Sequence, residues 1–199
     1  MPDYFSSRIF LLAPRSDEEE VAAVAEKLGW GFLGELSEEP AQLASRELIW
    51  GKSQNLTLHF REDFLTKSPC VFVSGADERR VATAARFTET QLKPATIDEI
   101  LEAADSVRQI PADYALAVMR LGLGAPEYFD ERIATRIAAA AENPEEEVRK
   151  AAAWATSYVV WPQFISLLER MAEYDSAEDV RRVARRIRNA YLEEGGAHE

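Results

Sequence analysis

The sequence predicts an α+β domain over residues 1–94, followed by an all-α domain of paired helices over residues 95–199. Short apolar stretches alternate with helical patterns in the first half, which is typical of a mostly antiparallel sheet with helices on one face. In the second half a helical motif recurs after 32 residues, the mark of a repeat architecture. Lys93-Pro94-Ala95 interrupts the helical pattern between them, so we place the boundary near Pro94.

The N-terminal half reads in the order strand, helix, four strands, helix. Residues 8–13 form a continuous apolar run that ends at Pro14, so we expect a strand buried on both faces. Leu56, Leu58 and Phe60 alternate with polar residues, which favours a sheet with one wet face. The predicted strands are 8–13, 30–36, 47–50, 56–60 and 70–74, and the predicted helices are 17–28 and 77–92.

The helical half begins with a predicted capping box, in which Thr96 and Glu99 open a helix over 96–107. Pro111 precedes a weaker opening helix at 114–123. Because the link at Pro94 is short, we expect the two halves to pack together, with the N-terminal layer closing one end of the helical stack. Two clearer pairs of helices follow, predicted at 127–142 with 145–159 and at 162–174 with 177–192.

The second helix of each clear pair carries the repeated motif. Asn143 and its copy are expected to accept a main-chain N–H at the helix start. Val148 and Ala152 lie at helical spacing on one apolar stripe, and Arg149 is expected to contact the turn of a neighbouring pair. The copied residues are Asn143, Glu146, Val148, Arg149 and Ala152, which recur as Asp175, Glu178, Val180, Arg181 and Ala184.

This pattern, an Asn or Asp shortly before Glu-Val-Arg-Lys-Ala-Ala-Ala at residues 147–153, resembles short bacterial HEAT repeats. The resemblance covers about residues 112–192 and implies an α-α superhelix whose second helices line a concave face. The residues that mark ankyrin and tetratricopeptide repeats are absent. A closed helical bundle is the alternative that the residues leave open.

The charge balance argues against several classes of function. The chain has 23 basic and 35 acidic residues, a formal net charge of −12, which disfavours nucleic-acid binding because such binding depends on neutralising phosphates. The same charge disfavours anionic membrane surfaces. No stretch approaches the ~18 apolar residues of a membrane span, and no signal peptide is visible. We therefore expect a cytoplasmic protein with no nucleic-acid or membrane partner.

Few residues suggest chemistry. The single cysteine, Cys70, lies in an apolar strand and is expected to be buried and inert. His59 precedes Glu62 and Asp63, but the only other histidine is His198, so we expect His59 on the wet face, or toward a groove, in a solvated strand end rather than a metal site. Nucleotide-binding glycine loops and the Gly-x-Ser-x-Gly elbow are absent. We therefore expect no cofactor, no metal and no catalytic residue.

The candidate binding residues lie on the second helices of the two clear pairs. Lys150 and Trp154 correspond to Arg182 and Arg186 in the next copy, and Arg185 lies beside them. A tryptophan near arginines is the composition enriched at binding hot spots. Two alternatives stay open: Trp154 packs on the N-terminal domain or on a second tryptophan, at position 161, and the arginines balance nearby acidic residues.

These observations favour a non-enzymatic protein–protein interaction module, a scaffold or adaptor whose concave face binds another protein. An immunity protein that neutralises a basic toxin is a specialised form of this hypothesis, because small size and acidity fit it. The alternative rests on the resemblance: bilin lyases and certain DNA glycosylases carry HEAT-like repeats, so the chain is an enzyme or enzyme subunit. The net charge argues against the glycosylase.

Overall fold

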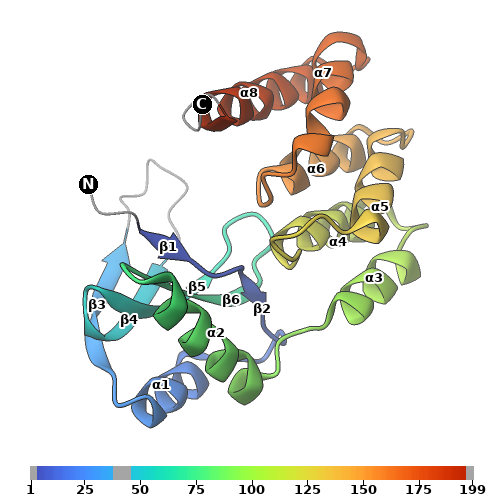
Figure 1. The fold of residues 1–199 in the computed structure, drawn as a ribbon. Coiled ribbons are helices and arrows are strands. Elements are labelled where there is room, and N and C mark those ends of the chain that lie inside the picture. Colours follow the sequence, from blue (N-terminus) through green and yellow to red (C-terminus); the bar gives the residue numbers. More distant parts are fainter. Residues whose placement is uncertain (1–3, 38–45, 196–199) are drawn as a thin grey trace. The chain divides into compact units, whose positions relative to one another are not determined.

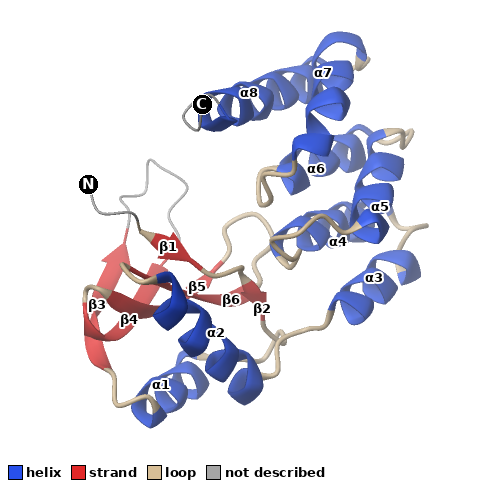
Figure 2. Ribbon diagram, viewed as in Figure 1, coloured by secondary structure: helices blue, strands red, loops and turns tan. Residues whose placement is uncertain are grey.

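The computed structural model describes residues 4–37 and 46–195. The chain divides into two compact units, Met1–Ala95 and Thr96–Glu199, here called the N-terminal unit and the helical unit (Figure 1). The division falls after Ala95, where the sequence predicted it after Pro94. Strands occur only in the N-terminal unit among the described residues, and six α-helices make up the helical unit (Figure 2).

The N-terminal unit is built on an antiparallel sheet of six strands. Its order is β1-β6-β5-β4-β3, and β2 pairs with β6 beside β1. The four longer strands, β3 to β6, pair in the order in which they follow one another along the chain. The strands are β1 (Phe5–Ser6), β2 (Phe10–Leu11), β3 (Gly31–Ser37), β4 (Arg46–Ser53), β5 (Leu56–Glu62) and β6 (Pro69–Gly75).

The first predicted strand, 8–13, was wrong in its extent. Only the short strand β2 lies within that range; β1 precedes it, and the chain between the two strands pairs irregularly with β6. Ser7 N–H donates to the Val73 carbonyl (2.8 Å), while the Ser7 hydroxyl accepts from Val73 N–H (3.0 Å) in place of a main-chain carbonyl. Because a side-chain hydroxyl takes the place of a main-chain carbonyl here, the regular β-ladder is interrupted. Phe10 and Leu11 are both buried, as a strand covered on both faces requires.

Two helices cover one face of this sheet, as predicted (Figure 1). They are α1 (Glu18–Lys27) and α2 (Glu78–Leu92), and the side chains of Asp17 and Asp77 cap them by accepting main-chain N–H groups. The core between sheet and helices contains Val21, Val24, Ala25, Leu48, Trp50, Leu58, Val71, Val73, Val81, Ala84 and Ala85.

The helical unit consists of three consecutive helix pairs, one more than the two clear copies in the sequence. The partners are α3 with α4, α5 with α6, and α7 with α8, and the second helices α4, α6 and α8 also pack side by side in that order. The predicted capping box of Thr96 and Glu99 is confirmed. No helix in the described part of the chain is long and apolar enough to cross a membrane. The helices are α3 (Ile97–Ser106), α4 (Pro111–Leu123), α5 (Glu131–Ala141), α6 (Glu146–Thr156), α7 (Ile165–Tyr174), preceded by the 3-10 turn η1 (Pro162–Phe164), and α8 (Glu178–Gly195).

Small side chains let the second helices approach closely. A Cβ atom at Gly122 of α4 would stand only 2.1 Å from the carbonyl oxygen of Ala155 in α6. Val148 of α6 and Val180 of α8 are both completely buried, at equivalent places in the two copies. The first helices are connected differently: the guanidinium of Arg132 in α5 lies 2.7 Å from the Asp98 carboxylate in α3. The layer of second helices is therefore apolar and tight.

Several predicted helix boundaries differ from those observed. The helix predicted at 114–123 begins at Pro111, the one at 162–174 begins with the turn η1, and the one at 177–192 extends to Gly195. Two further differences have a visible cause. The helix predicted at 127–142 begins instead at Glu131, because the Asp130 side chain caps it and the Glu127 carbonyl accepts a hydrogen bond from the Trp161 indole (3.2 Å). The helix predicted at 145–159 ends at Thr156. There the Tyr191 hydroxyl donates to the Thr156 carbonyl (2.7 Å), so a contact from α8 satisfies a helix-end acceptor.

Candidate functional site

The repeated motif folds the same way in both copies. Asn143 Oδ1 and Asp175 Oδ1 each accept the main-chain N–H of the residue two positions later, at 2.9 Å in both cases. Arg149 Nη1 donates to the Asn143 carbonyl, and Arg181 Nη1 donates to the Asp175 carbonyl. Each arginine thus closes the turn that leads into its own helix. The equivalence is one of geometry as well as sequence.

Arg149 also reaches the turn of the next helix pair. Its Nε and Nη2 lie 2.8 Å and 3.0 Å from the two carboxylate oxygens of Asp175, a bidentate contact, and both side chains are largely buried. Burial opposes ionisation of Asp175, but the Arg149 hydrogen bonds, the Ala177 N–H and the nearby guanidinium charges outweigh it, so the pKa of Asp175 is lowered. The stability gained from this carboxylate is present above pH ~4 and is lost as the pH falls through the lowered pKa.

Four of the candidate binding residues are at least partly exposed on α6 and α8. Lys150 and Trp154 are four residues apart on α6, and Arg182 and Arg186 are four apart on α8, so each pair occupies one helix face. Lys150 and Trp154 are half-buried, whereas both arginines are exposed. Because α6 and α8 pack side by side, we refer to these four residues as the α6–α8 strip.

The fifth candidate, Arg185, does not belong to this strip. Its Nε points to the carbonyl of Ala172 in α7 (3.4 Å), and its Nη2 lies 3.7 Å from Glu178. The equivalent position in α6 is Ala153, which is completely buried. The structure therefore places Arg185 toward the first helix of its own pair.

The charges of the strip are only partly neutralised. Arg182 pairs with Asp179 at 2.8 Å within α8. Lys150 and Arg186, by contrast, have no ion-pair partner within 4 Å among the described residues. In that part of the chain the ring partners of Trp161 are Phe129 and Phe164, not Trp154. The strip thus contains a half-buried indole and two cations that form no ion pair within the described part of the chain.

A second polar cluster, which the sequence did not indicate, lies on the other face of the sheet. His59 Nδ1 is 2.7 Å from a Glu47 carboxylate oxygen, and His59 Nε2 is 2.8 Å from the hydroxyls of both Ser74 and Thr57. The imidazole stacks on Phe72 at 4.4 Å. The expected wet face was wrong here, because only 12% of the His59 side chain is exposed. These residues come together because of the register of β4, β5 and β6. The alternation of residues along one strand does not reveal that register.

The Ser74–His59–Glu47 contacts have the distances of a nucleophile, a base and an orienting acid. The surroundings of Ser74 do not suit acyl transfer. Strand β6 pairs on both sides at this residue, with Ser6 and with Thr57, so the ladders engage the main-chain N–H groups that an oxyanion hole needs. Ser74 is itself buried. We interpret the cluster as a hydrogen-bond network that satisfies buried polar groups.

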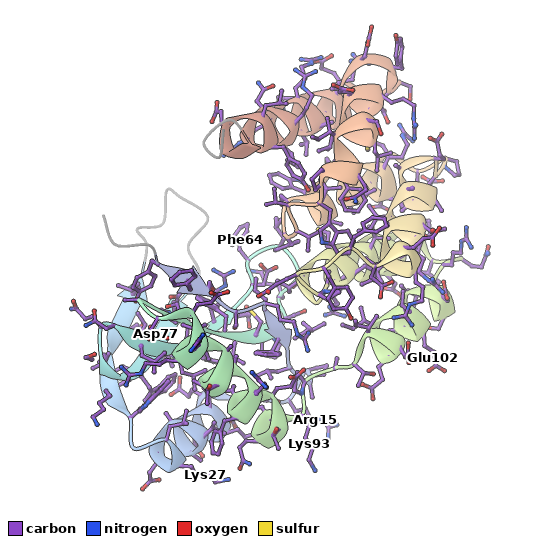
Figure 3. The ribbon with its side chains drawn as sticks, viewed as in Figure 1. Arg15, Lys27, Phe64, Asp77, Lys93 and Glu102 are labelled. Carbon is purple, nitrogen blue, oxygen red and sulfur yellow. The ribbon has the colours of Figure 1, made fainter. Side chains whose placement is uncertain are left out.

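An open cleft of about 560 Å³ lies at one end of the N-terminal sheet. Its rim includes Phe64, which projects from the loop between β5 and β6 (Figure 3). The two cations in the cleft are already engaged: Arg46 lies 2.7 Å from Glu18, and Lys67 Nζ lies 4.5 Å from the Phe64 ring centre. Among the described residues no group of His, Cys, Asp and Glu side chains is arranged to hold a metal ion.

Comparison with known proteins adds no assignment to these sites. No protein-family model matches the chain, and no curated protein or solved structure matches it significantly. The function must therefore be inferred from the residues of the chain itself.

Proposed function

We propose that the chain is a non-enzymatic protein-binding module, in which a short HEAT-like stack holds another protein along the α6–α8 strip. One observation carries the proposal: Trp154 shares a face of α6 with Lys150, Arg186 is exposed on the neighbouring helix α8, and these two cations have no ion-pair partner in the described part of the chain. Side chains that no intramolecular contact explains on a rigid, tightly packed surface are candidates for intermolecular contacts.

The chemistry of the strip indicates how a partner would be held. Burying the exposed part of an indole against an apolar pocket supplies binding free energy, and Trp and Arg are the residues most often found at such centres. The guanidinium of Arg186 is suited to bidentate contact with a carboxylate. A partner with an acidic rim around an apolar pocket therefore fits the strip best.

The test is affinity capture from the cytoplasm of the source cells with the full chain as bait. The variant combining Trp154→Ala and Arg186→Glu removes the indole and reverses the charge. We expect this variant to bind the partner at least about tenfold more weakly, which corresponds to a loss of about 1.4 kcal/mol in binding free energy.

A matched control changes the same residue types on the outer helix α7. Tyr174 and Arg170 are both exposed there, so Tyr174→Ala with Arg170→Glu alters an aromatic ring and a charge away from the strip. Capture should survive this change. Equal loss with both double variants, or normal capture by the strip variant with its fold intact by circular dichroism, would contradict the proposal.

A further inference from the structure

The open cleft at one end of the N-terminal sheet combines apolar and charged side chains around a volume of about 560 Å³. Leu48 of β4 and Phe60 of β5 lie directly opposite each other there, on the face of the sheet that the helices cover. Pro14 and Pro69 also line the cleft, and the Phe64 ring at its rim is 37% exposed. This size and this mixture of side chains are typical of small-molecule sites.

Two side chains of opposite charge line the cleft with their hydrogen-bonding groups unused. Glu62 lies at the end of β5 and is exposed, and its carboxylate has no hydrogen-bond or ion-pair partner among the described residues. Lys67 Nζ lies over the Phe64 ring, 4.5 Å from its centre, but its N–H groups have no acceptor in that part of the chain. The ring contact holds the ammonium in place and leaves its donors available.

The other charged side chains of the cleft are engaged within the chain. Arg46 lies 2.7 Å from Glu18. Asp17 caps helix α1, where its side chain accepts two main-chain N–H groups. A ligand in the cleft therefore meets one available carboxylate, that of Glu62, and one available ammonium, that of Lys67.

A tight turn connects these two residues and keeps their charges apart. Asp63 N–H donates to the Ser68 carbonyl (2.9 Å), and the Asp63 carbonyl accepts from Lys67 N–H (2.8 Å). The Asp63 side chain also accepts from Thr66 N–H (2.8 Å). Lys67 adopts a φ of 49°, in the left-handed region that residues other than glycine seldom occupy. Glu62 and Lys67 do not pair with each other, so the turn fixes two opposite charges at separate places.

The placement of these charges restricts the ligand. Both come from the two ends of one short turn, so the matching charges of the ligand must lie close together at one of its ends. The rest of the ligand must be apolar to lie against Phe60 and Phe64. A ligand with only one charge would leave the Glu62 or the Lys67 group without a partner inside the complex.

We infer that this cleft binds a free α-amino acid with an apolar side chain, in its zwitterionic form. The carboxylate of the ligand accepts hydrogen bonds from Lys67 Nζ, and its ammonium donates to the Glu62 carboxylate. This site is independent of the α6–α8 strip, because all of its residues belong to the N-terminal unit.

The probe is L-phenylalanine, titrated into the full chain and followed by isothermal titration calorimetry. Two analogues each lack one of its charges: 2-phenylethylamine has no carboxylate, and 3-phenylpropionate has no ammonium. Each analogue should bind at least about tenfold more weakly than the amino acid, because one charge-assisted hydrogen bond is lost. No detectable binding of L-phenylalanine, or equal binding of either analogue, would overturn the inference.

Two variants show which side chain holds which charge. With Glu62→Gln, L-phenylalanine should lose its advantage over 3-phenylpropionate, and with Lys67→Gln it should lose its advantage over 2-phenylethylamine. The matched control combines Glu26→Gln and Lys52→Gln, since both residues are exposed and lie outside the cleft. The control should bind all three ligands as the native chain does. Unchanged advantages in both cleft variants would rule out these two side chains as the ligand's partners.

Discussion

Cys70 is a titratable side chain whose pKa is strongly changed by its surroundings. It lies in β6 opposite Leu11 of β2 and is completely buried. Desolvation raises the pKa of its thiol to about 11, and the nearby Arg61 guanidinium offsets only part of that effect. At neutral pH the thiolate, the reactive form, is therefore almost absent. This agrees with the buried thiol that the sequence predicted.

The raised pKa predicts how stability depends on alkaline pH. The unfolded thiol ionises near its ordinary value of 9.0, and the folded thiol near 11. The contribution of Cys70 is therefore fully present below pH 9 and is lost as the pH rises through 11. The difference in unfolding free energy between the native chain and Cys70→Ala should shrink by about 2 kcal/mol from pH 8 to 11. Urea denaturation at each pH measures it, and a constant difference would show that the thiol ionises freely in the fold.

Contacts between helices depend on a few residues at the turns. The Arg149–Asp175 pair connects the second and third helix pairs, with only 12% and 5% of the two side chains exposed. Removing one member of a buried pair leaves the other charge without compensation. We therefore expect this pair to stabilise the packing of the second helix pair on the third more than an exposed ion pair would.

Asp175→Ala is expected to lower the unfolding free energy by about 3 kcal/mol. The control is Glu142→Ala, which removes a 3.0 Å ion pair to Arg170 whose members are 69% and 53% exposed. Exposed pairs contribute little, so the control should cost less than about 1 kcal/mol. Guanidinium denaturation followed by circular dichroism compares the two. Equal costs would show that the Arg149–Asp175 contact does not hold the helix pairs together.

The close approach of α4 and α6 makes a second prediction. At Gly122 an added methyl group would stand 2.1 Å from the Ala155 carbonyl oxygen, a main-chain atom that cannot rotate away. Gly122→Ala should therefore separate the helices and lower the unfolding free energy by about 1–3 kcal/mol. Gly31→Ala, where nothing lies within 4 Å of the new methyl group, should change stability by no more than about 0.5 kcal/mol. Thermal melts compare the stability of the two variants. Equal melting temperatures would show that α4 and α6 are not in close contact at Gly122.

Across the whole molecule, the sequence predicted what local patterns encode and missed what depends on distant contacts. The capping box of Thr96 and Glu99 consists of short-range hydrogen bonds, so its residues could be predicted directly from the sequence. The pair α3–α4 was not recognised as a repeat, because Ile110 and Pro111 open its second helix where the other copies have Asn or Asp. Strand β1 is too short for any periodicity to appear.

The candidate sites show the same limit. A spacing of 32 residues aligned Lys150 and Trp154 with Arg182 and Arg186, and the helices that carry the two pairs, α6 and α8, pack side by side. Arg185 was grouped with them because sequence proximity does not tell which neighbouring helix a side chain meets. The His59 network was missed because it needs the register of three strands.

The central claim is that a partner protein covers the α6–α8 strip. Hydroxyl-radical footprinting of the purified complex tests it most directly, with Trp154 as the reporter and Tyr174, on the outer helix α7, as the internal reference. Oxidation of Trp154 should fall several-fold when the partner binds, while oxidation of Tyr174 stays unchanged. Unchanged oxidation of Trp154, or protection of Tyr174 in its place, would contradict the claim.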